Sequence, residues 1–425
     1  MRLLRENADL RWLFFAQVVS FLGDWFTFVA IAALVLDATG SEFLVAVAYV
    51  SFSLPSFLAS PIAGSLVDRF DRRRLLLVVS ALQAVAALGL LTASNDRVWP
   101  LFLFQGLISS LAAVVKPAID AGVPNLARSP DELRRANAMF GSMWGVMLAV
   151  GAGIGGIFSE AFGRQAAFIA DAITFVVALA LFSLVRRPMQ EPQHRSDRTP
   201  VRPIADMREA IRYARRDRVV MSLVGSKATF AIGAGTVSQL PVLARDAFGW
   251  GDVGTGLLMG ARGVGVGLGP LIAAQFTKGQ LSRVLRVCGI AGVAYSAFYL
   301  GAAWVPLLPV AAIFIALGHL GGGSQWTLSS FGLQVRTPDA IRGRVMAGDF
   351  AIVTLVISIT SLLAGWLSEA VGAQWTITVS ACAAGLAGAI YLVVTTPVAR
   401  QLEAEHAAAS AIAASTAPSR ESPDA

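Results

Sequence analysis

Five ionisable residues interrupt long apolar stretches of this sequence, where a charge is costly. Asp24, Lys227, Arg262 and Asp349 each have mostly apolar or small neighbours, and His319 lies just before three consecutive glycines. Ionisable residues in such surroundings usually face a cavity or a partner, and they often mark the path of a substrate or a proton. We therefore take these five residues as the first candidates for the chemistry of the protein.

Asp24 has the strongest pattern around it. Gln17, Ser20, Asp24 and Thr27 follow one another at intervals of three or four residues, so they share one face of a helix. A polar stripe of this kind would not face lipid. We predict that Asp24 binds and releases a coupling proton, with Asp349 as the second candidate. The alternative is a carboxylate held in a permanent ion pair or capping a distorted turn.

Other side chains in the apolar stretches are candidates to line a substrate cavity, and each has a structural alternative. Aromatic residues of the first stretch face lipid more often than a cavity. Lys227 and Arg262 could each belong to a structural ion pair with a carboxylate, and His319 suits packing or hydrogen bonding. The cavity candidates are Gln17, Trp25, Phe28, Lys227, Arg262 and His319.

The composition points to a membrane as the solvent of these stretches. The chain is 56% hydrophobic and 14% charged, with a mean hydropathy of +0.65, whereas soluble domains carry about 25% charged residues. A spanning helix needs about 20 apolar residues. We predict an all-α integral membrane protein with twelve spans, the ninth and tenth being separated at the prolines of Trp304–Pro309. The spans are expected near 12–36, 43–67, 75–94, 98–116, 137–159, 165–185, 219–244, 253–276, 285–303, 307–330, 345–368 and 373–395.

Basic residues set the orientation of these spans. Most of the 34 lysines and arginines fall in alternate loops, and the other loops hold only Arg97, Arg164 and Arg245. Loops rich in Lys and Arg stay in the cytoplasm, so both termini are expected there. Membrane topology accounts for the net charge of +7, and nucleic-acid binding is not expected.

The chain repeats itself after half its length. Asp37–Gly40 resembles Asp246–Gly249, and Gly156–Gln165 resembles Gly365–Gln374, both at an offset of 209 residues. We predict two parallel six-helix halves related by an axis along the membrane normal. The expected divisions are the N-terminal bundle 1–187, a cytoplasmic linker 188–216, the C-terminal bundle 217–399, and a polar cytoplasmic tail 400–425 that is disordered apart from a possible short helix.

A cluster of charged residues between the second and third spans resembles a known motif. The major facilitator superfamily has Gly-x-Leu-x-Asp-Arg-x-Gly-Arg-Arg there, and this chain has Gly64-Ser-Leu-Val-Asp-Arg-Phe-Asp-Arg-Arg73. The resemblance implies a latch that holds the cytoplasmic gate shut when the protein opens outward. The implied latch residues are Gly64, Asp68, Arg69, Arg72 and Arg73. The alternative is a loop whose arginines only set topology.

Further motifs resemble the branch of macrolide-efflux proteins and siderophore exporters. Gly151, Gly155 and Gly156 are similar to the exporters' glycine motif in the fifth helix. The other similar segments are Gly23-Asp24, Pro124-Asn-Leu, Leu133-Arg-Arg-Ala-Asn137, Asp171-Ala-Ile-Thr-Phe175 and Arg342-Gly-Arg344.

The resemblance implies a secondary transporter of the bacterial inner membrane that works by alternating access. We expect a monomer that exports an amphiphilic small molecule, such as a drug, a macrolide-like compound or a siderophore, against a proton gradient. We expect no cofactor or metal site. Two alternatives stay open: a proton-linked importer of the same fold, and a membrane-embedded sensor or partner that does not transport. An intramembrane enzyme is not expected, since no set of His, Ser or carboxylate residues has catalytic spacing.

Overall fold

The computed structural model describes residues 2–190 and 203–416, and this part of the chain is almost entirely helical. The N-terminal half contains α1 (Arg2–Glu6), α2 (Ala8–Thr39), α3 (Glu42–Ser51), α4 (Leu54–Arg69), α5 (Arg72–Gly89), the 3-10 turn η1 (Leu90–Thr92), α6 (Trp99–Leu126), α7 (Pro130–Phe162) and α8 (Arg164–Ser183). The C-terminal half contains α9 (Pro203–Arg216), α10 (Arg218–Ile232), α11 (Gly235–Ser238), α12 (Leu240–Asp246), α13 (Asp252–Thr277), α14 (Leu281–Trp304), α15 (Leu308–Arg336) and α16 (Asp339–Thr416).

Eleven helices in the described residues are long and apolar enough to cross a membrane. The last of them, Arg344–Ser410, joins two helices across Gly372, which has a φ of 78° and a ψ of 163°. The sequence predicts a break between two spans at this place, so the segments on either side of Gly372 correspond to the last two predicted spans. The predicted division near Trp304 is confirmed, because α14 ends there and α15 begins at Leu308.

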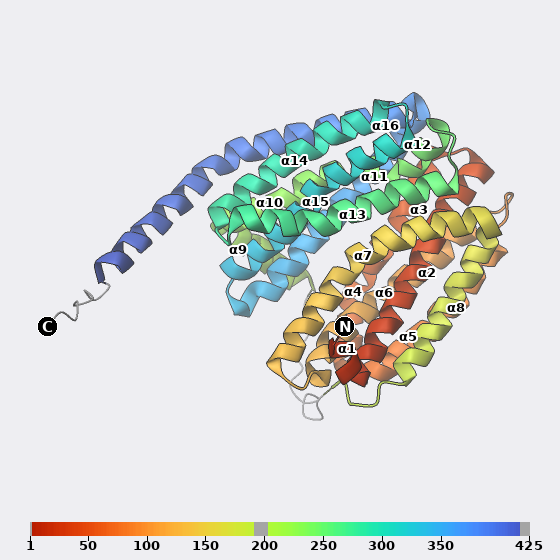
Figure 1. Cartoon of the computed structure of the whole chain (residues 1–425), viewed down its shortest axis with the longest axis horizontal. Helices are drawn as coiled ribbons and strands as arrows, with labels where there is room; N and C mark the ends of the chain where they lie inside the picture. The colour runs from red at the N-terminus through yellow and green to blue at the C-terminus, as the bar shows by residue number, and fades with distance from the viewer. Residues whose placement is uncertain (1, 191–202, 417–425) are drawn as a thin grey trace.

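The end of the chain differs from the expected polar tail. α16 continues to Thr416, and its last part projects away from the bundle (Figure 1). Helix-forming alanines dominate this segment, and an ion pair between Arg286 and Glu403 (2.7 Å) connects it to α14. The expectation of a disordered tail is therefore corrected for residues 400–416, while residues 417–425 lie outside the described part.

The internal repeat is visible in the backbone. Gly40 and Gly249, which are 209 residues apart, have φ values of 62° and 67°, and Gly163 and Gly372, at the same spacing, have 86° and 78°. Positive φ is readily available only to glycine. Each half therefore turns at the same two positions after its first and fifth spans.

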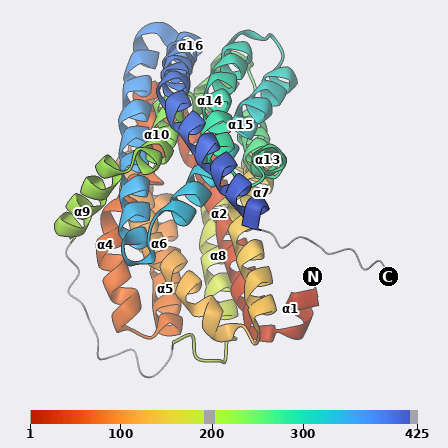
Figure 2. The same cartoon turned by 90° about the vertical axis from the view of Figure 1, so that its left-hand side faces the viewer.

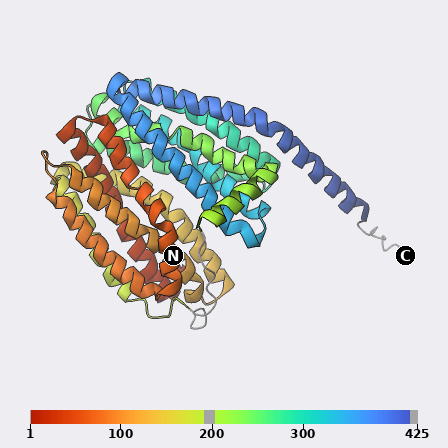
Figure 3. The same ribbon diagram turned by 180° about the vertical axis from the view of Figure 1, so that it is seen from behind.

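The two halves converge at one end of the molecule and diverge toward the other (Figures 1 and 3). α7 packs along α13, and α3 packs against α16, so both contacts join one half to the other. The linker helix α9 lies at the margin of the C-terminal half, where it packs against α10 and α16 (Figure 2). One apolar cluster of the C-terminal half also includes Phe28, Val29 and Ala152 of the N-terminal half.

A polar network ties the start of the chain to the turn between α6 and α7. The Asn7 side-chain amide donates to the Leu126 carbonyl oxygen and to Glu132 Oε2, both at 3.0 Å. Slight burial raises the pKa of Glu132, but the N–H of Arg128, the Asn7 amide and the charges of Arg128 and Arg187 lower it further, so its net pKa lies below the ordinary value. The network fixes the end of the N-terminal half at which the two halves diverge.

Candidate functional site

A cluster of ion pairs joins the two halves at the end where they converge. Arg164 of α8 donates through Nη1 to Asp37 Oδ2 (2.6 Å) and through Nη2 to Asp252 Oδ1 (3.1 Å). Arg245 of α12 also reaches Asp37, with Nη1 at 2.9 Å from Oδ1. The Ser159 hydroxyl donates to Asp252 as well. We call this the closed end, defined by Asp37, Ser159, Arg164, Arg245 and Asp252.

Two equivalent helix contacts lie near the closed end, and the halves exchange roles between them. A Cβ on Gly156 would meet the Asp252 carbonyl oxygen at 2.5 Å, and a Cβ on Gly365 would meet the Glu42 carbonyl oxygen at 3.2 Å and Ala46 Cβ at 2.6 Å. Gly156 and Gly365 are equivalent in the repeat. α7 therefore meets α13 as α16 meets α3, which is the relation that an axis along the membrane normal produces between parallel halves.

Small residues let α7 and α13 approach each other closely along their length. A Cβ on Gly256 would lie 2.6 Å from the Ala152 carbonyl oxygen, and a Cβ on Gly263 would lie 2.3 Å from the Ala149 nitrogen. Gly260 meets the same stretch of α7, with 3.0 Å to the Ala149 oxygen. Close backbone approach of this kind is typical of packing between membrane helices. We call this contact the seam.

The predicted exporter glycines all lie at close helix contacts. A Cβ on Gly151 would meet Trp25 Cδ1 at 2.9 Å, and a Cβ on Gly155 would meet Phe26 Cα at 3.1 Å. Gly156 faces α13 at the closed end. The three glycines thus hold α7 between α2 and α13, and they act here through packing.

The C-terminal half contains a buried ion pair between two candidates that the sequence selected separately. Lys227 of α10 donates from Nζ to Asp349 Oδ2 and to Ser330 Oγ, the latter at 2.9 Å. The two charged side chains are only 4% and 1% exposed. The Trp326 ring lies 5.2 Å from Nζ, and Asp349 Oδ1 has no hydrogen-bond partner among the described residues. Burying two charges is costly unless they are paired and fully hydrogen-bonded. The unpaired oxygen of Asp349 therefore makes this buried pair less favourable.

Arg262 and His319 lie near each other, but only the histidine has a hydrogen-bond partner among the described residues. His319 is fully buried and its Nε2 lies 2.8 Å from the Tyr299 hydroxyl, an arrangement that suits a hydrogen-bonding role. Arg262 is 9% exposed and forms no ion pair with any carboxylate in the part of the chain that the structure describes. Its guanidinium lies 5.9 Å from the centre of the Trp144 ring, across the seam. An arginine at the centre of a membrane helix costs about 2.5–3.5 kcal/mol on insertion scales.

The helix that bears Asp24 contacts a second carboxylate, that of Asp171. Asp171 of α8 is fully buried and accepts a hydrogen bond from Thr27 Oγ1 at 2.6 Å and from Thr174 Oγ1 at 3.3 Å. A Cβ on Gly23 would lie 2.3 Å from Asp171 Oδ1, so the helix bearing Asp24 passes directly over this carboxylate. Asp24 and Asp171 lie on α2 and α8, which pack against each other, and two ionised carboxylates on facing helices repel each other.

Only part of the predicted latch can be compared with the structure. The side chains of Gly64, Asp68 and Arg69 lie outside the described residues. Arg72 donates from Nη1 to the carbonyl oxygens of Ala121 and Met189, both at 2.8 Å, and Arg73 donates to the Ser183 carbonyl oxygen. Ala121 and Ser183 belong to the N-terminal half, and Met189 follows directly after it at the start of the predicted linker. These bonds therefore connect helices of the N-terminal half to one another and to that linker.

Asp71, which stands where the superfamily motif has glycine, caps a helix. Its side chain accepts a hydrogen bond from the Arg74 N–H at 2.8 Å, at the start of α5. A carboxylate at this position satisfies a free N–H group and complements the helix dipole. The turn between α4 and α5 is therefore stable without the glycine.

The remaining cavity candidates are spread along α2. Gln17 is buried, while Trp25 and Phe28 pack edge-to-face at 5.4 Å between ring centres. Phe28 also contacts Tyr49 and Phe52, so it forms part of an aromatic cluster between α2 and α3. The structure brings Trp25 to the glycines of α7 but does not bring it to Lys227 or His319.

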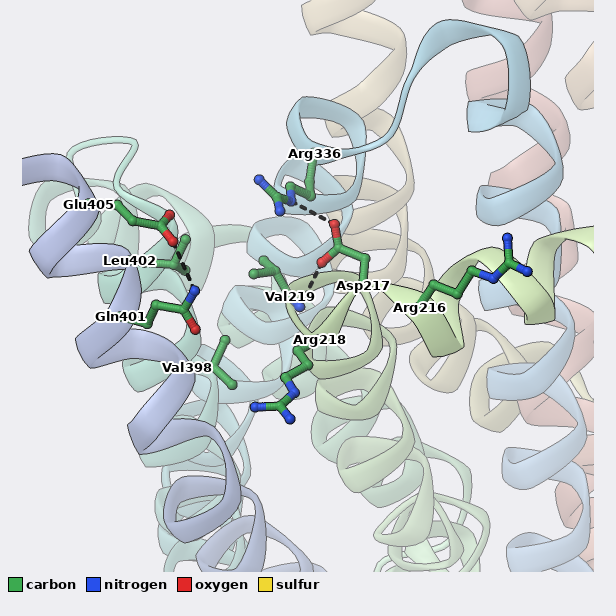
Figure 4. Close-up of a pocket in the computed structure, with 9 residues that line it drawn as sticks. All are labelled: Arg216, Asp217, Arg218, Val219, Arg336, Val398, Gln401, Leu402 and Glu405. Atoms are coloured by element: carbon green, nitrogen blue, oxygen red, sulfur yellow. Dashed lines mark hydrogen bonds and ion pairs between the residues drawn. The ribbon is translucent and has the colours of Figure 1, made fainter. Parts of the chain in front are cut away.

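Two surface pockets lie away from these residues. One, of about 400 Å³, is formed by the ends of α9, α10, α15 and the outer part of α16, where Asp217 pairs with Arg336 at 2.8 Å (Figure 4). The other, of about 690 Å³, is lined in part by the closed-end residues Ser159, Arg164 and Asp252.

Sequence reasoning missed the ion pairs of the closed end. Arg164 and Arg245 were two of three basic residues in loops otherwise free of Lys and Arg, and this rarity was the available signal. Asp37 even appears in the repeat through its counterpart Asp246. Spacing along the chain could not show that Arg164 and Asp252 meet, because they come from different halves.

Comparison with known proteins identifies the family. Residues 4–420 match the transmembrane secretion effector family. A candidate bacilysin exporter, BacE of Bacillus amyloliquefaciens, is 24% identical over 375 residues, which cover 87% of this chain and 91% of the relative. The multidrug efflux pump Tap of Mycobacterium tuberculosis is 26% identical over 381 residues, covering 85% and 87%.

Solved structures agree with this match at the level of the fold. A peptide transporter of the POT family superposes with a TM-score of 0.75 at 13% identity, covering 93% of this chain and 96% of that one. A bacterial homologue of the human lysosomal transporter Spinster, in an inward-facing conformation, superposes with a TM-score of 0.72 at 16% identity, covering 91% and 96%. The chain therefore belongs to the transmembrane secretion effector family, and it is a membrane transporter of the major facilitator superfamily rather than an enzyme.

Proposed function

We propose that the protein is a proton-coupled exporter of amphiphilic small molecules that works by alternating access in a bacterial inner membrane. Both termini are then cytoplasmic, and the closed end faces the periplasm. The names of the relatives, a candidate bacilysin exporter and a multidrug efflux pump, support export. In this orientation the diverging ends of the halves face the cytoplasm, as an exporter requires for loading its substrate.

The observation that carries the proposal is the buried pair of Lys227 and Asp349. A proton on Asp349 would remove the charge that holds Lys227, and the Lys227 ammonium group would then lack a counter-ion. The unpartnered oxygen of Asp349 leaves one position open for the incoming proton. Proton binding therefore neutralises Asp349 and leaves the Lys227 ammonium group buried without a counter-ion.

The helix that bears Asp349 offers a route from the proton to the conformation. α16 also carries Gly365 and Glu369, and Glu369 accepts a hydrogen bond from Ser41 of the other half. Sixteen residues of helix separate Asp349 from Gly365, which is about 24 Å. A ligand shifts a conformational equilibrium only by its different affinity for the two states. A proton on Asp349 would weaken the contact between α10 and α16. Because α16 also contacts the other half, the proton would bind the two conformations with different affinity.

Asp24 and Asp171 form the second group proposed to take part in proton exchange. A proton bound to either carboxylate would remove the repulsion between them. Asp171 keeps its hydrogen bonds from Thr27 and Thr174 within the N-terminal half, which leaves Asp24 as the member that exchanges. The sequence selected Asp24, and its neighbour Asp171 strengthens that choice.

The experiment that tests the function measures transport in two membrane orientations. Inverted membrane vesicles containing the protein would be energised to an acidic interior and given rhodamine 6G or radiolabelled naphthalene-1-sulfonate. We expect uptake of at least one probe into the vesicles, extrusion from whole cells, and loss of both when a protonophore collapses the gradient. Accumulation in whole cells instead would favour the importer, and an absence of flux in both systems would favour a sensor or partner.

A further inference from the structure

Arg262 differs from the other buried or interfacial cations of the described chain. Lys227 is paired with Asp349, and Arg164 is paired with two aspartates at the closed end. Arg262 is 9% exposed, forms no hydrogen bond or ion pair to any described residue, and its Nε is buried without an acceptor. A buried guanidinium without a counter-ion is unfavourable. Its presence calls for a partner that the described residues do not supply.

The surroundings of Arg262 favour a ligand over a missing protein contact. Its guanidinium reaches across the seam to the Trp144 ring of the N-terminal half, at 5.9 Å, and that residue is 45% exposed. The neighbouring groups on the C-terminal side, His319, Tyr295 and Tyr299, hydrogen-bond to one another or to Thr236 and carry no negative charge. A half-exposed aromatic ring beside a free guanidinium presents an apolar surface next to a set of N–H donors.

We propose that Arg262 binds a carboxylate or another oxyanion of the transported molecule, while Trp144 contacts its apolar part. This assignment rests on the proposed transport function and specifies its substrate class as anionic amphiphiles. A guanidinium matches oxyanions because its N–H groups can donate two parallel hydrogen bonds. The charge and the ring come from different halves, so the ligand contacts both at once. Its affinity therefore depends on the separation of the halves, as coupling requires.

A purely structural role for Arg262 makes a different prediction. The cation–π contact with Trp144 could simply stabilise the seam. In that case, replacing Arg262 would lower the thermal stability of the protein but would not make binding any less selective for anions. The test must therefore measure binding and stability separately.

The experiment compares ligands that differ only in charge. Purified full-length protein in a neutral detergent would be titrated with naphthalene-1-sulfonate and naphthalene-1-sulfonamide, and with 1-naphthaleneacetate and its amide. We expect each anion to bind about ten-fold more tightly than its neutral counterpart, as one charged hydrogen-bonded contact provides. Arg262→Gln should reduce the affinity for the anions to that of the amides, and Arg262→Lys should retain part of the preference. Arg97→Gln, at an exposed position outside the seam, is the matched control and should behave as the unaltered protein.

Several results would overturn the proposal. Equal binding of the charged and neutral probes would do so, as would a preference for anions that survives Arg262→Gln, or no binding of any anion. If Arg262→Gln does not fold, Trp144→Leu keeps the charge and should weaken both members of each pair equally. No proton gradient is involved, so a negative result here is distinct from a failure of proton-coupled export.

Discussion

Lys227 and Asp349 should each stabilise the folded protein only while the other is present. Lys227→Ala leaves a buried carboxylate without a counter-ion, and such a loss costs about 3–5 kcal/mol of folding free energy. The double variant Lys227→Met/Asp349→Leu removes both charges and should recover most of this loss. Unfolding in a denaturing detergent would measure both effects.

The exposed pair of Lys116 and Asp120 is the control. Its side chains are 75% and 55% exposed, so Lys116→Ala should cost about 1 kcal/mol or less. If the buried pair responds no more than this surface pair, Lys227 and Asp349 are not coupled as described.

Gly23 should be intolerant of even a methyl group because of Asp171. Gly23→Ala places a Cβ 2.3 Å from Asp171 Oδ1 and 2.1 Å from Thr174 Oγ1, so the hydrogen bonds around Asp171 must change. We expect reduced transport and a lower melting temperature. Gly153→Ala meets nothing within 4 Å and should match the unaltered protein; equal effects of the two substitutions would contradict the assignment.

The sequence indicated which single residues are candidates for function. It did not indicate which of them contact one another. Asp24, Lys227, Arg262 and Asp349 stand out because charge is rare in apolar helices. The pairing of Lys227 with Asp349 was open, since these residues are 122 positions apart. The contact between Asp171 and the helix that bears Asp24 was open as well, since Thr27, which donates to Asp171, lies 144 positions away along the chain.

Among the elements, the seam between α7 and α13 gives the sharpest prediction. Gly263→Ala would bring a Cβ within 2.3 Å of backbone atoms of Ala149, which only a separation of the helices can relieve. Overpacking of this kind costs about 1–3 kcal/mol. Gly267→Ala, one turn away on α13, has open space. We expect a lower melting temperature for the first variant alone, and similar melting curves for both would contradict the close packing described.

The positions of the helices follow from the sequence because long apolar runs leave little choice in a bilayer. The prolines after Trp304 and the repeated turn at Gly372 mark two boundaries between spans correctly. The extension of α16 to Thr416 was not expected. Alanine-rich composition is compatible with a helix or with a flexible tail, and the contact of Glu403 with Arg286 cannot be read from composition.

For the whole molecule, the ion pairs of the closed end should set the balance between conformations. Arg164→Gln removes the contacts with Asp37 and Asp252, so the closed end should open more often. Spin labels at residues 95 and 307, one in each half, would report a longer average distance. Arg97→Gln is the control, because Arg97 forms no ion pair with a described residue. Unchanged distances in Arg164→Gln would show that the ion pairs of Arg164 are not needed to hold this end shut.

The parallel relation between the halves was predictable, since two matching segments at the same offset of 209 residues fix both the repeat and its direction. The conformation was not predictable. The sequence predicts the same helices within each half whatever the conformation of a transporter. Conformations differ in the contacts between the halves, such as that of Arg245 with Asp37.

The most direct test of proton-coupled export is proton movement driven by the substrate. Protein would be reconstituted into liposomes that contain a pH-sensitive dye, and rhodamine 6G or naphthalene-1-sulfonate would be added outside. We predict an internal pH change that depends on the transported probe, that disappears in Asp349→Asn, and that is weakened in Asp24→Asn, while the purified variants still bind the probe. Probe transport by the unaltered protein without any pH change, or a pH change at the same rate in Asp349→Asn, would contradict the account.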